Sequence, residues 1–260
     1  MTIQRVRASL EGRKALVVGI ANENSIAWGC AKWLRALGAD IAVTYLNDKA
    51  KRFVEPIAQQ LEAPIFMPLD VMVDGQTEAV FERIKQEWGR LDILVHSIAF
   101  STKDALHGRV VDVPRAGFAT TMDVSCWSFM RMAHLAEPLM TNGGSMFTMT
   151  YYGSQMVVEN YNIMGVAKAA LEAAVRYMAA ELGPKGIRVH AISPGPLQTR
   201  AASGIPEFDE LLHKAQEKAP ARSLVSIDDV GSATAFLALD VAKLITGETI
   251  YIDGGYHIID

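Results

Sequence analysis

The chain has 260 residues, 50% of them hydrophobic, and carries a formal net charge of −4 at pH 7. This length and apolar content favour one large domain around a single core. The sequence shows no basic block interleaved with aromatic residues, no cleavable apolar leader and no apolar run of bilayer-spanning length. We therefore expect neither a nucleic-acid-binding protein nor a membrane protein, and we expect a cytoplasmic location.

The cysteines and histidines give no sign of a metal site. Cys30 and Cys126 lie far apart in apolar helical stretches, and neither belongs to a CxxC pair. We expect buried packing thiols, a reducing compartment and no metal. His96 and His190 fall inside predicted strands and are expected to be satisfied core residues.

The first predicted strand covers 14–20, and a helix over 25–38 follows it. Gly19 permits a tight turn between them, and Ser25 is a good cap for a helix whose free N–H groups would face a pyrophosphate. The loop lacks the GxGxxG spacing of a dinucleotide fingerprint, so an ordinary strand–helix connection remains the alternative.

The end of the second predicted strand, 40–46, bears on the choice of cofactor. An acid there would hold an adenosine ribose and an arginine would favour a 2′-phosphate, but Leu46 and Asn47 are neither. Because no basic residue stands at this strand end, we predict NADH rather than NADPH. The third strand, 64–71, contains Asp70, which would accept a hydrogen bond from an adenine amino group or, alternatively, serve the turn.

The remaining elements continue the alternation of strands and helices. In chain order they are a helix over 74–89, a strand over 91–99, a helix over 123–140, a strand over 145–150, a helix over 160–183, a strand over 187–193, a helix over 228–239 and a strand over 248–255. Such alternation favours a parallel sheet with helices on both faces. The sequence therefore predicts a doubly wound, Rossmann-type α/β fold with a seven-stranded parallel sheet, as one domain over 1–260.

One segment, 194–223, interrupts this rhythm with four prolines and three short helical patches. It is too long for a tight connection. Because it follows the carboxyl end of the sixth strand, where ligands bind in such sheets, we predict a substrate lid, with irregular packing as the alternative.

The stretch from Tyr151 to Lys168 carries the candidate catalytic side chains. A carbonyl-reducing enzyme on such a chain is expected to place a tyrosine four residues before the lysine, but Met164 stands there and Tyr161 comes seven residues before the lysine. Seven residues turn a helix through about 700°, so Tyr161 and Lys168 share a face if both are helical. Tyr151 is either a second proton-donating group or a packing aromatic.

Six stretches together resemble one family. GIANENSIAWG, LDV, HSIAF, YYGSQMVVENYNIMGVAKAAL, SPGPLQTRAASGI and TGETIYIDGGYHII are similar, in order and at compatible spacing, to the type II enoyl-acyl-carrier-protein reductases. These are a divergent branch of the short-chain dehydrogenase/reductase family. The resemblance covers nearly the whole chain. It implies NADH-dependent reduction of the trans-2 double bond of enoyl-acyl-carrier-protein thioesters, the last step of the fatty-acid elongation cycle.

The resemblance also implies roles for individual residues. It implies cofactor contacts from the first strand end to the lid, at Gly19, Ser25, Ile26, Asp70, Val71, Ser97, Ile98, Ala99, Lys168, Leu197, Gln198, Thr199, Arg200 and Ala201. It implies substrate contacts at Ser101, Tyr151 and Tyr161, with Tyr161 facing the thioester oxygen. The catalytic residues would be Tyr151, Tyr161 and Lys168.

The implied reaction explains why Tyr161 lies farther from Lys168 in the sequence than the tyrosine of a carbonyl reducer. Conjugate reduction brings hydride to Cβ, whereas negative charge develops on the thioester oxygen several bonds away. A donor for that oxygen must lie away from the hydride site, and one well-placed donor contributes about 3 kcal/mol.

The resemblance further implies an acyl-carrier protein as partner and a homotetramer, for which the apolar C-terminal segment would suit an interface. Two alternatives remain open. One is a carbonyl-reducing short-chain dehydrogenase, against which Met164 argues. The other is a catalytically silent dinucleotide-binding sensor, which would be expected to lack Tyr161 or Lys168.

Overall fold

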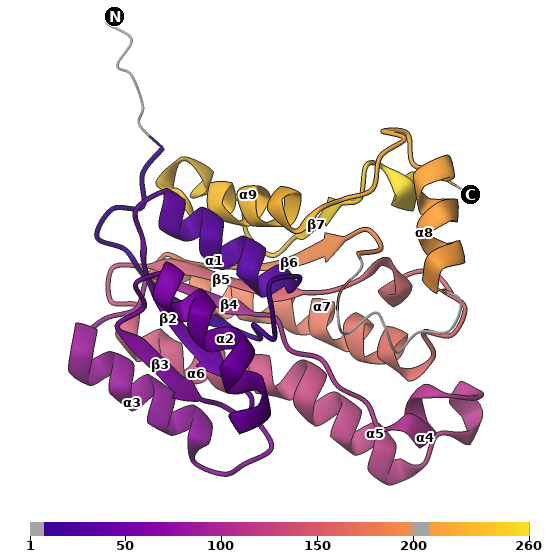
Figure 1. Cartoon of the computed structure of the whole chain (residues 1–260), viewed down its shortest axis with the longest axis horizontal. Helices are drawn as coiled ribbons and strands as arrows, with labels where there is room; N and C mark the ends of the chain where they lie inside the picture. The colour runs from indigo at the N-terminus through magenta and orange to yellow at the C-terminus, as the bar shows by residue number, and fades with distance from the viewer. Residues whose placement is uncertain (1–7, 198, 200–207, 260) are drawn as a thin grey trace, which may run out of the picture.

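The computed structural model describes residues 8–197, 199 and 208–259. Seven strands form one parallel sheet in the order β3-β2-β1-β4-β5-β6-β7 (Figure 1). They are β1 (Lys14–Val18), β2 (Asp40–Tyr45), β3 (Ile65–Pro68), β4 (Ile93–His96), β5 (Gly144–Met149), β6 (Ile187–Pro194) and β7 (Thr249–Ile252). The predicted seven-stranded parallel sheet is confirmed.

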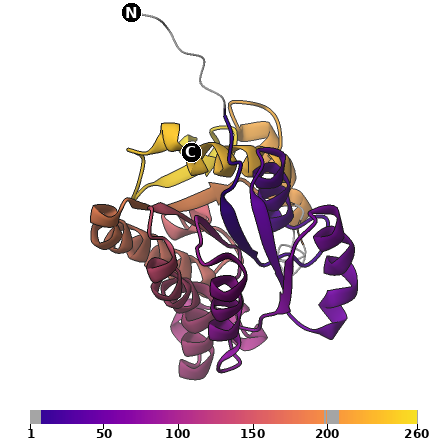
Figure 2. The ribbon, with the colours of Figure 1, turned by 90° about the vertical axis from the view of Figure 1, so that its left-hand side faces the viewer.

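Helices cover both faces of this sheet, as Figure 2 shows. On one face lie α1 (Ile26–Ala36), α2 (Asp48–Gln60) and α9 (Ile227–Ala238), which share a core with the strands. On the other lie α3 (Gln76–Trp88), α6 (Ser128–Ala136) and α7 (Ile163–Leu182). The short helices α4 (Lys103–Leu106), α5 (Arg115–Met122) and α8 (Phe208–Lys218) lie beyond the carboxyl ends of the strands. The doubly wound arrangement is thus confirmed, and none of the described helices is long and apolar enough to cross a membrane.

The order of the strands fixes where a ligand can bind. From β1 the chain winds outward through β2 and β3, then returns to build β4 to β7 on the other side. The carboxyl ends of β1 and β4 therefore meet where the winding direction changes, and ligands bind at this point in such sheets.

Two helices differ from the sequence prediction, one in its existence and one in its first residue. The helix α2 was not predicted; it begins after Asn47, whose side chain accepts a hydrogen bond from Ala50 N at 3.0 Å. The helix α3 begins at Gln76 rather than Asp74, because Gly75 has a φ of 82° and cannot be helical.

The predicted helix over 123–140 is one part of a longer, irregular helix. Helical structure already begins at Arg115 in α5, passes through a π-helical turn at Asp123–Trp127 and continues as α6. A π-turn inserts an extra residue and changes the direction in which the following side chains point. It thereby turns Ser125 toward the loop after β4.

The helix α7 begins at Ile163, so the expectation that Tyr161 is helical is wrong. Asn160 and Asn162 have φ values of 61° and 42°, and such positive φ angles end a right-handed helix. Tyr161 therefore sits in the turn before α7. The shared-face argument does not apply to it, and its position relative to Lys168 is set by tertiary packing.

Candidate active site

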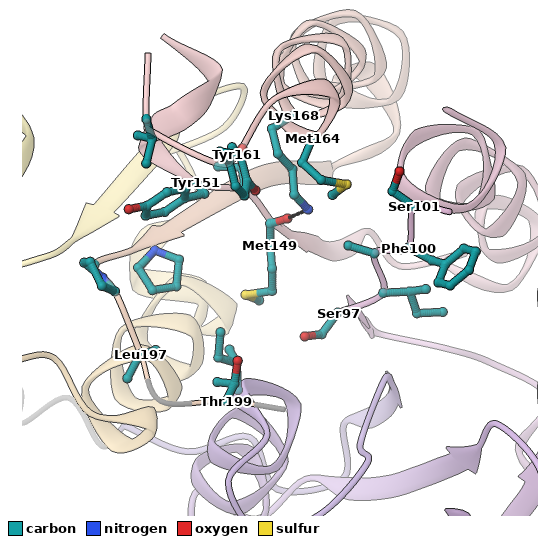
Figure 3. A pocket seen from close by; sticks show the side chains of 18 of the residues that line it. Ser97, Phe100, Ser101, Met149, Tyr151, Tyr161, Met164, Lys168, Leu197 and Thr199 are labelled. Carbon is teal, nitrogen blue, oxygen red and sulfur yellow. Dashed lines mark hydrogen bonds between the residues drawn. The ribbon is translucent and has the colours of Figure 1, made fainter. Parts of the chain in front are cut away.

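A cavity of about 380 Å³ opens at the carboxyl ends of β4, β5 and β6. Its walls come from the first turn of α1, the loop after β4, the loop after β5 with the start of α7, and the segment after β6 (Figure 3). The lining residues are Ile26, Ser97, Ile98, Ala99, Phe100, Ser101, Leu106, Met149, Thr150, Tyr151, Val158, Glu159, Tyr161, Met164, Lys168, Pro194, Gly195, Pro196, Leu197 and Thr199. Most of these side chains are apolar. Tyr151, Tyr161 and Lys168 lie on one side of the cavity, whereas Ser97, Ser101 and Thr199 lie on other walls (Figure 3).

The floor of the cavity forms where β1 and β4 end side by side. Ser97 N donates a hydrogen bond to Val18 O at 3.0 Å. A Cβ on Gly19 would lie 2.1 Å from Ser97 O, and Gly19 has a φ of 106°. Only glycine fits such a close backbone approach.

Ser25 shapes the loop after β1 instead of capping α1 with its side chain. It occupies the predicted N-cap position, but its hydroxyl makes no hydrogen bond to the helix. Its Oγ accepts hydrogen bonds from Ala21 N at 3.0 Å and Asn22 N at 3.1 Å. The first-turn N–H groups of α1 thus donate no bond to this side chain. Trp28 N and Gly29 N donate to Ser25 O at 2.9 and 3.3 Å, which leaves the N–H groups of Ile26 and Ala27 for an anionic group.

Tyr151 and Tyr161 stand together on one wall of the cavity. Their ring centroids are 5.0 Å apart and the rings are inclined by 71°. The ring of Tyr161 also packs on Gly153, where a Cβ would come within 2.5 Å of Tyr161 Cδ1. Burial raises the pKa of both phenols, and the neighbouring Tyr151 raises that of Tyr161 further. Both hydroxyls are therefore protonated donors at neutral pH.

The hydroxyl of Tyr151 is buried and has no hydrogen-bond partner among the described residues. A buried hydroxyl without a partner costs about 1–3 kcal/mol. A polar atom of a bound ligand would remove this cost, so this hydroxyl is a candidate contact of the substrate or cofactor.

Lys168 reaches the cavity from α7. Its side chain is buried, and its Nζ donates to Met149 O at 2.7 Å. Burial lowers the pKa of this amine to about 8, an effect that Cys126 and Glu172 partly oppose. Met164, one turn earlier on α7, faces the same cavity and presents a thioether where a carbonyl reducer would present a phenol.

Two hydroxyls hold the wall opposite the tyrosines. Ser125, from the π-turn, accepts from Phe100 N at 3.0 Å and donates to Phe100 O at 3.1 Å. Thr121 Oγ1 lies 2.8 Å from Ser101 Oγ and donates to Gly117 O. The loop after β4 is thus fixed at two consecutive residues.

The two strand histidines are core residues, as predicted. His96 is fully buried, with Nδ1 3.0 Å from Thr148 Oγ1 and Nε2 2.8 Å from Ser128 Oγ. Burial, and next the charge of Lys168, lowers its pKa to about 3. His190 is also buried and stacks on Phe147, but its ring nitrogens have no partner among the described residues. The prediction of a satisfied histidine is therefore wrong for His190.

Comparison with known proteins identifies the family of this fold and site. A family model described as enoyl-(acyl carrier protein) reductase matches residues 19–257. The chain belongs to this reductase family. It is 47% identical over 253 residues to the enoyl-acyl-carrier-protein reductase (NADH) FabI of Synechocystis sp., with 96% of this chain and 98% of that one covered.

Solved structures agree with this assignment to the reductase family. The structure of the reductase from Anaplasma phagocytophilum in complex with NAD has a TM-score of 0.92 and 46% identity, covering 96% of this chain and 95% of that one. The Bacillus cereus reductase, solved with NADP+ and indole naphthyridinone, has a TM-score of 0.94 and 43% identity, covering 96% and 98%.

Most of the site residues predicted for a reductase lie on the cavity. They are Ile26, Ser97, Ile98, Ala99, Ser101, Tyr151, Tyr161, Lys168, Leu197 and Thr199. Gly19 and Ser25 shape the adjoining floor and loop. Asp70 and Val71 do not line it: Asp70 Oδ1 accepts from Met72 N at 3.0 Å, and Val71 packs on the core. Gln198, Arg200 and Ala201 lie outside the described residues.

Several lining residues were not among the predicted ones. They are Phe100, Leu106, Met149, Thr150, Val158, Glu159, Met164, Pro194, Gly195 and Pro196. Phe100 and 194–196 follow the ends of predicted strands, and Met149 and Thr150 are the last residues of another. Their place at strand ends was therefore the signal in the sequence that could have identified them. Leu106 is the last residue of α4, whereas Val158 and Glu159 come from the loop before α7, and their inward position depends on how these segments fold.

Proposed function

We propose that this protein reduces the trans-2 double bond of enoyl-acyl-carrier-protein thioesters with NADH, at the last step of the fatty-acid elongation cycle. The observation that carries the proposal is the grouping of two protonated tyrosines, Tyr151 and Tyr161, with Lys168 in one apolar cavity. Met164 stands where a carbonyl reducer would keep its tyrosine.

The described residues fit a bound dinucleotide. The close approach of Gly19 to Ser97 leaves room along the floor, and the N-terminus of α1 offers N–H groups for a pyrophosphate. Lys168 would hold the nicotinamide ribose, and Ser97 to Ala99 would lie beneath it. When bound, NADH supplies the hydride that Cβ of the substrate receives.

Residues of this chain stabilise the negative charge that the reaction creates on the substrate. Hydride addition to Cβ pushes the double-bond electrons toward the thioester oxygen, which becomes an enolate oxygen. Tyr161 donates a hydrogen bond to that oxygen, and the ring of Tyr151 packs against the ring of Tyr161. Solvent or a relay returns a proton to Cα, which leaves the saturated thioester. Electrostatic stabilisation of this kind is commonly the largest catalytic contribution.

The apolar part of the cavity suits an acyl chain. Phe100, Leu106, Met149 and Met164 line it, and flexible thioethers adapt to chains of different length. We further propose that segment 194–223 acts as a lid; Leu197 and Thr199 at its start already line the cavity.

The partner and assembly are also proposals. The substrate implies an acyl-carrier protein as the partner. A homotetramer is supported by large apolar side chains exposed along α5–α7 and at the C-terminal end, among them Trp127 (49% exposed), Tyr177 (72%) and Ile258 (68%). The free, buried thiols of Cys30 and Cys126 support a reducing, cytoplasmic location.

The proposed function is tested by following NADH oxidation with a crotonyl thioester and, in parallel, with a β-keto thioester. We expect turnover of the enoyl substrate alone. Turnover of the keto substrate alone would make the protein a carbonyl reductase, and no turnover of either would favour a binding role. Repeating the assay with NADPH tests the cofactor, and a strong preference for NADPH would contradict our choice.

A further inference from the structure

Glu172 is a buried carboxylate on α7 for which the proposed chemistry has no role. It is 4% exposed, and a buried carboxylate is unfavourable unless hydrogen bonds or an opposite charge compensate it. Its place in the helix shows what compensates it. Glu172 lies four residues after Lys168, so the two side chains leave α7 on the same face.

The hydrogen bonds of Glu172 reach the loop that carries a candidate catalytic tyrosine. Its Oε1 accepts from Thr150 Oγ1 at 2.7 Å and from Ser154 Oγ at 2.6 Å. These two hydroxyls flank Tyr151 in the sequence. One carboxylate oxygen thus ties both ends of the segment 150–154 to α7.

The same loop is joined to α7 at two further points. Lys168 Nζ donates to Met149 O, just before Thr150. A Cβ on Gly165 would lie 2.6 Å from Gly153 O, so the loop also packs directly on the first turn of α7. Glu172 therefore belongs to a contact between this loop and α7. If the loop shifted along α7, Tyr151 would move relative to Lys168.

We propose that Glu172 is a positioning residue, which fixes the Tyr151 loop to α7 through Thr150 and Ser154. Its negative charge also balances the positive charge of Lys168 inside the protein. This inference rests on the proposed function, because it assigns Glu172 to the same cavity. It predicts that two properties depend on Glu172: the geometry of the tyrosine and the pH range over which Lys168 is cationic.

Other titratable groups surround this pair. Those that act on the pair are Tyr161 before α7, Cys126 from the π-turn, His96 from β4 and Tyr251 from β7. Tyr152, Asp253 and Tyr256 lie around Tyr151 next to them. Burial lowers the pKa of Lys168 to about 8, whereas the charge of Glu172 raises it and also raises the pKa of Tyr161. Removing that charge alone should therefore shift the loss of the Lys168 charge to lower pH.

The test separates charge from geometry. Glu172→Gln keeps an oxygen that can accept from both hydroxyls but removes the charge. Ser154→Ala removes one hydrogen bond but keeps the charge. NADH affinity, measured by nicotinamide fluorescence between pH 6 and 10, and kcat with a crotonyl thioester are followed for both variants. Glu181→Gln, at an exposed position on the same helix, is the matched control.

For the wild type we expect NADH affinity to fall as pH rises through about 8. In Glu172→Gln this fall should move to lower pH by roughly one pH unit, while Glu181→Gln leaves it in place. Ser154→Ala should keep the wild-type pH profile but lose roughly tenfold in kcat, because small misplacements of catalytic groups are costly.

An unshifted profile in folded Glu172→Gln would overturn the charge role, and unchanged kcat in Ser154→Ala would overturn the positioning role. If Glu172→Gln does not fold, the double variant Ser154→Ala, Thr150→Val tests the proposal instead. Its kcat must fall, while the pH dependence of its NADH affinity must stay as in the wild type. A wild type that does not reduce the enoyl thioester would contradict the proposed function instead, while the NADH-binding profiles would still test Glu172.

Discussion

At the scale of single residues, the arrangement of the tyrosines differs from a simple helical repeat. Tyr161 is seven residues from Lys168, but it belongs to the turn before α7, where positive φ angles at Asn160 and Asn162 break the helix. Its ring is positioned by Tyr151 at 5.0 Å and by the missing side chain of Gly153. The direction of its hydroxyl is thus decided by contacts outside the helix.

The substitution Tyr161→Phe removes the donor without changing the ring that packs on Gly153. We expect kcat with a crotonyl thioester to fall about 100-fold or more, since loss of one donor to a developing oxyanion has about this effect. Tyr177→Phe on the exposed face of α7 is the matched control. Turnover equal to that of the wild type would show that Tyr161 does not stabilise the enolate.

At the scale of elements, the contact between α1 and α9 is made by two glycines. A Cβ on Gly231 would lie 2.3 Å from Gly29 O, and a Cβ on Gly29 would lie 2.1 Å from Ile227 O. The two backbones therefore cross without intervening side chains. This contact fixes the helix whose N-terminus faces the proposed pyrophosphate site.

Gly231→Ala should force α1 and α9 apart. We expect the free energy of unfolding to drop by about 1–3 kcal/mol, the usual cost of overpacking, and NADH affinity to weaken because α1 moves. Denaturant unfolding and NADH titration measure the two effects. Gly183→Ala is the control, since a Cβ there would meet nothing within 4 Å, and equal stability of both variants would contradict the close crossing.

At the scale of the whole molecule, two neutral histidines lie within the sheet. Burial lowers the pKa of His96 to about 3 and that of His190 to about 4, from the ordinary value of 6.5. Below pH 6.5 the unfolded chain binds protons at these residues, whereas the folded chain does not. Stability is therefore complete above pH 6.5 and is lost as pH falls toward the folded pKa values.

Between pH 7 and pH 5, each histidine should reduce the free energy of unfolding by about 2 kcal/mol. Thermal or urea unfolding at the two pH values measures the change. His190→Leu should remove about half of it, while His213→Gln, at an exposed position on α8, should not. A pH dependence unchanged in His190→Leu would mean that this histidine is protonated in the fold.

The sequence by itself determined the sheet, most of the helices that cover it and the residue types of the candidate site. Alternating apolar strands and helical patterns were sufficient, because burial on both faces and the 3.6-residue period leave local signals. The glycine after β1 and the unusual tyrosine spacing were also readable. These signals lie in short, contiguous stretches.

Only the tertiary structure decided how those residues meet. The place of Tyr161 before α7, the π-turn that directs Ser125 to Phe100, and the bonds from Glu172 to Thr150 and Ser154 all join segments separated along the chain. Such contacts produce no periodic pattern of residue types in the sequence, because they depend on how several elements pack together. The residue types of the candidate site were therefore visible in the sequence, and the geometry of that site arose from packing.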